Sequence, residues 1–92
     1  MLSTHGLVCI AIAMGGDEWT LREIGDRVGI AERSTHRIVT DLEREGYVRI
    51  GKEGARNTYT LITEAPLRHA MLRHMTLGDL MRGLKVKPRR AR

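Results

Sequence analysis

The sequence predicts an α+β domain that is mainly helical, with three helices, a β-sheet of two or three strands and an extra C-terminal helix. Residues 20–48 carry apolar positions at the spacing of two short helices that cross over one small core. Two alternating runs, 47–51 and 58–62, flank a polar turn, which predicts a β-hairpin. The chain has 92 residues, 41% of them hydrophobic and none of them Phe, so we expect one modest aliphatic core.

A first helix is expected from Ser3 or Thr4, either of which can act as its N-cap, to about Met14. This segment is apolar nearly all round, which predicts burial on two sides, against the body and against something else. Residues 15–17 end the helix, and residues 18–19 are expected to form a short first strand that pairs with the hairpin.

The next two helices are expected to be joined by a tight turn. Thr20 and Glu23 have the spacing of a reciprocal capping box at the start of the first of them. Gly29 falls where the chain leaves this helix and can take the left-handed conformation, while Gly25 lacks a Cβ on the face that the following helix must approach. That following helix is expected at about 32–45. The pattern is that of a helix-turn-helix, which places its second helix in the DNA major groove.

The outer face of this second helix is basic, because Ile38 and Leu42 must face inward. The residues left outside, which we expect to contact DNA, are Arg33, Ser34, His36, Arg37, Thr40 and Arg44. The arginines are three or four positions apart and share a face. An arginine fork can bond both acceptors of a guanine edge. The alternative is a solvated helix surface whose arginines pair with neighbouring carboxylates.

The hairpin carries further cations, Arg49, Lys52 and Arg56, around a tip that Gly54 allows to turn. We expect the segment at about 48–62 to lie on the adjacent DNA backbone or in the minor groove. Glu53 at the tip would be unfavourable beside a phosphate. A hairpin with ordinary surface charges is the alternative.

The runs 34–39 (STHRIV) and 41–48 (DLEREGYV), followed by the hairpin, resemble the winged helix-turn-helix transcription regulators. The resemblance covers about 4–63 and is closest to the DNA-binding domain of the IclR family. MarR-type and ArsR-type repressors are next in similarity. It implies sequence-specific binding of double-stranded DNA by a small transcriptional regulator, with 1–63 as the DNA-binding domain. An IclR-type effector domain would need more chain than follows the hairpin.

A C-terminal helix is expected over 64–84, with a heptad-like seam. The seam consists of Leu67, Ala70, His74, Leu77, Met81 and Leu84. Thr76 with Asp79 could instead start a separate short helix. We expect a homodimer through the first and C-terminal helices. Residues 85–92 form a basic tail that is expected to be disordered.

Several function classes are disfavoured. His5 and Cys9 are four apart, but a metal site needs three or four ligands, so no metal or other cofactor is expected. The chain has no phosphate loop, nucleophile elbow or CxxC, and we expect neither an enzyme nor a small-molecule ligand. The uncharged run 6–14 is too short to span a membrane, which predicts a cytoplasmic protein. The alternatives to DNA-sequence recognition are a protein–protein interaction module and nonspecific nucleic-acid binding through the basic tail.

Overall fold

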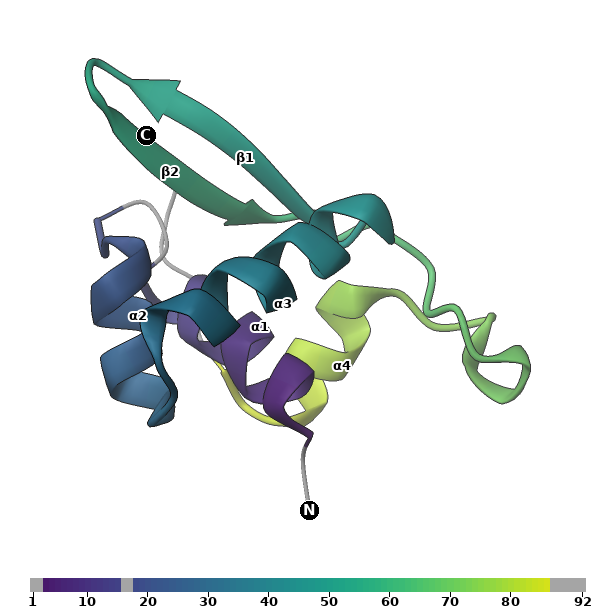
Figure 1. Ribbon diagram of the computed structural model, residues 1–92. Coiled ribbons are helices and arrows are strands. Elements are labelled where there is room, and N and C mark those ends of the chain that lie inside the picture. Colours follow the sequence, from purple (N-terminus) through teal and green to yellow (C-terminus); the bar gives the residue numbers. More distant parts are fainter. Residues whose placement is uncertain (1–2, 16–17, 87–92) are drawn as a thin grey trace.

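The computed structural model describes residues 3–15 and 18–86 and has the predicted winged helix-turn-helix fold (Figure 1). In chain order the elements are α1 (Thr4–Gly15), α2 (Leu21–Val28), α3 (Glu32–Arg44), β1 (Val48–Glu53), β2 (Arg56–Leu61), a 3-10 turn (Ala70–Leu72) and α4 (Leu77–Gly83). The two strands form an antiparallel hairpin that projects from the helical body, and α4 is the extra C-terminal helix.

The connection between α2 and α3 confirms the predicted helix-turn-helix. Thr20 Oγ1 accepts a hydrogen bond from the Glu23 N–H at 3.1 Å, and Glu23 Oε1 accepts one from the Thr20 N–H at 2.8 Å. These bonds favour the ionised carboxylate and hold the pKa of Glu23 below its usual value. Gly29 ends α2 with a φ of 92°, in the left-handed region. A Cβ on Gly25 would lie 2.5 Å from Thr35 Oγ1, so the glycine allows the two helices to cross closely.

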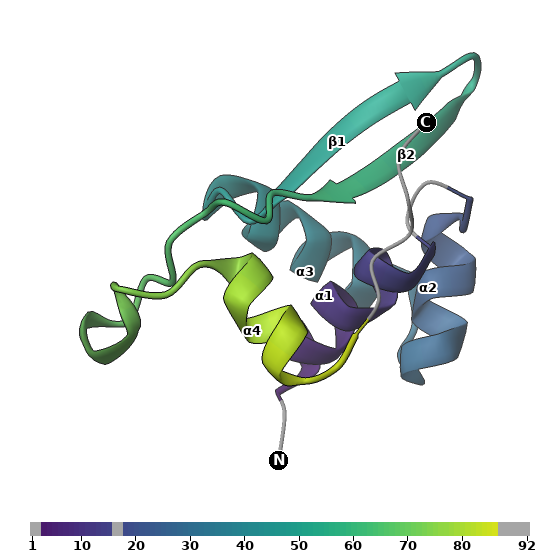
Figure 2. The same cartoon turned by 180° about the vertical axis from the view of Figure 1, so that it is seen from behind.

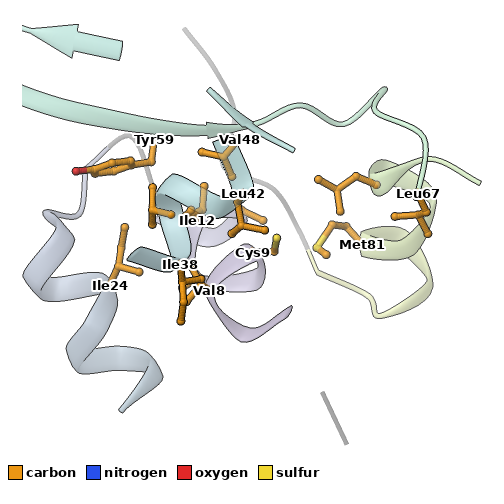
Figure 3. Close-up of a cluster of buried hydrophobic side chains, with 14 residues drawn as sticks. Val8, Cys9, Ile12, Ile24, Ile38, Leu42, Val48, Tyr59, Leu67 and Met81 are labelled. Atoms are coloured by element: carbon orange, nitrogen blue, oxygen red, sulfur yellow. The ribbon is translucent and has the colours of Figure 1, made fainter. Parts of the chain in front are cut away.

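The core lies between α1, α2, α3 and the base of the hairpin, and Figure 3 shows its side chains converging. Val8 and Ile12 of α1 are buried in the same cluster as Ile24 and Ile38, from the two helices of the helix-turn-helix. Thr35 is the buried polar residue of α3, and its hydroxyl donates to the Ala31 carbonyl at 2.9 Å. Burying this face of α3 fixes which side chains point outward.

The prediction of a strand at residues 18–19 is wrong, because the described part of the chain forms a sheet of two strands only, β1 and β2. The Glu18 and Trp19 N–H groups both donate to the Gly15 carbonyl, at 2.9 and 2.8 Å, and are therefore unavailable to the hairpin. The Trp19 ring packs on Gly15, where an added Cβ would lie 2.6 Å from it. The Arg27 guanidinium lies over this ring, 3.9 Å from the ring centroid.

The C-terminal helix is shorter than the expected 64–84. Pro66 and Thr76 form an isolated antiparallel bridge, and the chain between them is a loop that contains only the 3-10 turn. The helix begins after Thr76, whose hydroxyl accepts from the Asp79 N–H at 3.1 Å while the Asp79 carboxylate accepts from the Thr76 N–H at 2.9 Å. This capping box matches the separate short helix named as the alternative, and it lowers the pKa of Asp79.

The heptad-like seam does not form one continuous surface. Leu67, Leu77 and Met81 are buried in the core of the same chain, whereas the other three members, Ala70, His74 and Leu84, are exposed. Figures 1 and 2 show α3 and α4 on opposite sides of α1, so α4 is the second cover that the apolar first helix requires. Val86 also packs against the core, and its N–H donates to the Met81 carbonyl at 2.9 Å. The expected disordered tail therefore does not begin at 85, and residues 87–92 lie outside the described residues.

Candidate nucleic-acid interface

The outer face of α3 carries the six side chains predicted for it. Arg33, His36, Arg37 and Arg44 are exposed, and Ser34 and Thr40 are half-buried. The opposite face, made of Thr35, Ile38, Val39 and Leu42, is buried. We call Arg33, Arg37 and Arg44 the arginine stripe, because their spacing of four and seven positions places them on one side of the helix.

Two members of the arginine stripe are free to meet a ligand. Arg33 and Arg37 make no hydrogen bond or ion pair with any residue that the structure describes. Arg44 Nη1 lies 3.5 Å from Asp41 Oδ1, but this pair is exposed and such contacts contribute little to stability. His5 Nε2 approaches the other oxygen of the same carboxylate at 3.3 Å. The Asp41 carboxylate is thus already held by two partners.

The two hydroxyls of the predicted site differ. The Thr40 Oγ1 donates to the His36 carbonyl one turn earlier, at 2.8 Å, and so has no hydrogen left for a ligand. Ser34 instead lines a shallow pocket together with Arg37, beside the start of α1. Of the two, Ser34 is the better donor toward a phosphate or a base edge.

The structure does not bring the three predicted hairpin cations onto one surface. Arg49 lies opposite Thr60 in the ladder, whereas Lys52 lies opposite Asn57. Because they are three positions apart on one strand, their side chains leave opposite faces of the hairpin. Both are exposed on the β1–β2 hairpin, which we call the wing.

Arg56 turns back onto the body. Its Nη2 donates to the Glu18 carbonyl, and its charge contributes to lowering the pKa of Glu23. This arginine therefore connects the wing to the start of α2, a role that sequence spacing did not indicate. The carbonyl that it binds belongs to the segment that had been expected to form a strand.

Arg68 is a second residue whose role the sequence did not reveal. Its N–H donates to the Tyr47 hydroxyl at 2.7 Å, and its Nε lies 3.2 Å from both the carbonyl and the carboxylate of Glu45. These contacts hold the loop before α4 against the C-terminal end of α3. The available signal was an aromatic hydroxyl directly after a helix, which does not identify a partner 21 positions away.

His5 and Cys9 are one helical turn apart on α1, but their surroundings differ. Cys9 is buried, which raises the pKa of its thiol to about 11, and Figure 3 shows its sulfur on the side of Met81. His5 instead contacts Asp41 of α3. Within residues 3–15 and 18–86, no three side chains of the metal-binding types come together.

No helix in the described part of the chain is long and apolar enough to cross a bilayer.

The chain is similar to one solved structure and to one protein family. A solved structure of CymR, the global cysteine regulator of B. subtilis, is 22% identical and is matched over 100% of this chain and 71% of that chain, with a TM-score of 0.49. No curated protein matches the chain. Residues 10–50, which run from α1 through the helix-turn-helix into β1, match the family model of the IclR helix-turn-helix domain. This segment is therefore similar to the IclR helix-turn-helix domain, as the sequence resemblance predicted.

Proposed function

We propose that the protein is a small transcriptional regulator that binds double-stranded DNA at specific sequences, with α3 in the major groove. The observation that carries this proposal is the arginine stripe, in which Arg33 and Arg37 are exposed and unpaired within the described part of the chain. The opposite face of α3 is locked into the core, so the arginines project from a rigid helix. Arginine is the side chain that most often bonds both major-groove acceptors of guanine.

The wing supplies contacts to the adjacent backbone or minor groove in this proposal. Arg49 and Lys52 leave opposite faces of the hairpin, so one faces the duplex while the other remains in solvent. Arg56 acts indirectly, because it holds the wing in place through the Glu18 carbonyl. Neutralising one phosphate contributes up to about 0.9 to the log–log salt slope. We expect that loss in slope from only one of Arg49→Ala and Lys52→Ala.

The test of the proposal begins with a site selected from a random duplex library. Arg37→Ala should weaken binding to that site by about 1–3 kcal/mol, the range for a good bidentate base contact. Arg22→Ala, on the exposed side of α2, removes the same charge and serves as the matched control. Equal affinities for wild type and Arg37→Ala would refute the assignment of α3 as the reading helix.

A homodimer remains part of the proposal, but its surface changes because α4 covers one side of α1. Leu7 and Met14 are 40% and 52% exposed, with the half-buried Ile10 between them. This stripe lies on the side of α1 away from Ile12, which is buried toward α3. Pairing through it would point the two α3 helices away from each other, so each protomer would bind its own duplex. Sedimentation should give twice the 10.4 kDa of one chain. A monomer at micromolar concentration would remove the dimer.

We also propose that 1–63 is the DNA-binding unit, that 64–84 covers its core and that the basic residues at the end of the chain add nonspecific affinity. Five of the last eight residues are Lys or Arg, and such a segment can neutralise phosphates without reading bases. The chain should be stopped after Val86, because Val86 packs against the core. Specific and random duplexes should then lose affinity together, with a shallower salt slope. An unchanged salt slope would exclude a role for the tail.

We also propose a cytoplasmic location, which is the one that a regulator of this kind requires.

A further inference from the structure

A shallow pocket lies between the start of α1 and the outer face of α3. Its polar lining comes from Ser3, Thr4, His5, Ser34 and Arg37. Arg37 therefore belongs both to this pocket and to the arginine stripe. We propose that the pocket holds a backbone phosphate of the bound duplex, beside the groove that α3 enters. This inference rests on the proposed function and adds α1 to the DNA-contacting surface.

The pocket has the donors that a phosphate needs. Hydroxyl groups and guanidinium groups are among the side chains that contact DNA phosphates, and such contacts fix the register of a protein on its site. The side chains of Thr4, Ser34 and Arg37 make no hydrogen bond within the described ranges, so their donors are available. Ser3 Oγ accepts from the Gly6 N–H at 3.1 Å and keeps its own hydrogen to donate.

The charges around the pocket also favour an anion. The Asp41 carboxylate, which the pocket residue His5 contacts at 3.3 Å, also lies 3.5 Å from the Arg44 guanidinium, which offsets part of its charge. Glu32 and Glu43 are eleven positions apart, about three helical turns, and share the other flank of α3. The first turn of α1 contains no acidic residue. A phosphate therefore meets less repulsion on the α1 side of α3 than on the opposite side.

Thr4→Glu tests the inference without weakening the fold. A carboxylate in the first turn of a helix interacts favourably with the helix dipole, so thermal unfolding should occur at the same or a higher temperature. The same carboxylate would occupy the place of the phosphate. We expect both specific and random duplexes to bind about tenfold more weakly, with a salt slope that is shallower by about 0.9.

Met71→Glu is the matched control, because it makes the same change in net charge at a loop position that is 77% exposed. It should reduce affinity by less than about twofold, since salt screens a distant charge. Equal losses in the two variants would mean that net charge alone acts, and would overturn the inference. So would unchanged binding in Thr4→Glu; if Arg37→Ala still weakened binding, the proposed role of α3 would stand.

A free phosphate is the other ligand with this chemistry, and a second measurement distinguishes it. Thermal unfolding is followed in inorganic phosphate and in chloride at equal ionic strength. If phosphate stabilises wild type but not Thr4→Glu, and duplex affinity is the same for both, the pocket serves a free anion and the backbone assignment is wrong. If wild type binds no duplex, the proposed function fails together with this inference.

Discussion

Gly25→Ala tests the close crossing of α2 and α3 on which the position of the reading helix depends. The added Cβ would lie 2.5 Å from Thr35 Oγ1 and 3.0 Å from the Ile30 carbonyl oxygen. The Thr35 hydroxyl is held by its bond to the Ala31 carbonyl, and the Ile30 oxygen belongs to the backbone of the turn, so neither can move freely. Overpacking of this kind costs about 1–3 kcal/mol. Alanine regains about 1 kcal/mol of helix propensity. The 2.5 Å contact places the overpacking cost in the upper part of this range, at about 2–3 kcal/mol, so we expect a net loss of about 1–2 kcal/mol.

Gly83→Ala provides the control, because an added Cβ there meets no atom within 4 Å. Urea unfolding followed by circular dichroism should show a lower midpoint for Gly25→Ala and an equal or higher midpoint for Gly83→Ala. In the double variant Gly25→Ala/Thr35→Ala the closest contact is removed, so the two losses should be less than additive by about 1 kcal/mol. A Gly25→Ala protein as stable as wild type, or strictly additive losses, would refute the close crossing.

Three further predictions concern single side chains. Burial raises the pKa of the Cys9 thiol from its usual 9.0 to about 11 in the fold, so its contribution to stability is full below pH 9 and is lost as the pH rises through 11. Urea unfolding across this range should show the loss, and Cys9→Ala should abolish it. Tyr47→Phe removes the acceptor of the Arg68 backbone N–H and should lower the free energy of unfolding by about 1 kcal/mol. Hydrogen exchange at the Arg68 amide should become faster, and unchanged exchange would contradict the contact. Arg56→Ala should lower the unfolding temperature whereas Lys52→Ala should not, and equal temperatures would show that Arg56 has no structural role.

The helix-turn-helix could be predicted from the sequence because its signals are local. The capping box joins Thr20 to a residue three positions later, and Gly25 and Gly29 mark the crossing and the turn within the same short segment. The buried face of α3 follows from helical periodicity alone. The exposed arginines were then found by elimination, which is why their positions agree with the structure.

The errors lie where the outcome depends on residues far apart in the chain. The heptad-like pattern after the hairpin is real as a spacing, but the bridge between Pro66 and Thr76 divides it before it can form one helix. The strand expected at residues 18–19 fails because the Gly15 carbonyl takes both N–H groups. The charge of Arg56 and its place near a turn predict a DNA contact. Only the folded chain places it beside the Glu18 carbonyl.

The most direct test of the central proposal is a loss-of-contact measurement at the selected DNA site. Each guanine of the site is replaced in turn by 7-deazaguanine, which lacks the N7 acceptor, and binding is measured for wild type and for Arg37→Ala. For wild type, one such replacement should cost about 1 kcal/mol or more, because one bond of a bidentate contact is lost. At that same guanine, Arg37→Ala should bind the natural and modified duplexes equally. If Arg37→Ala remained as sensitive as wild type to every replacement, α3 would not read the major groove through this arginine.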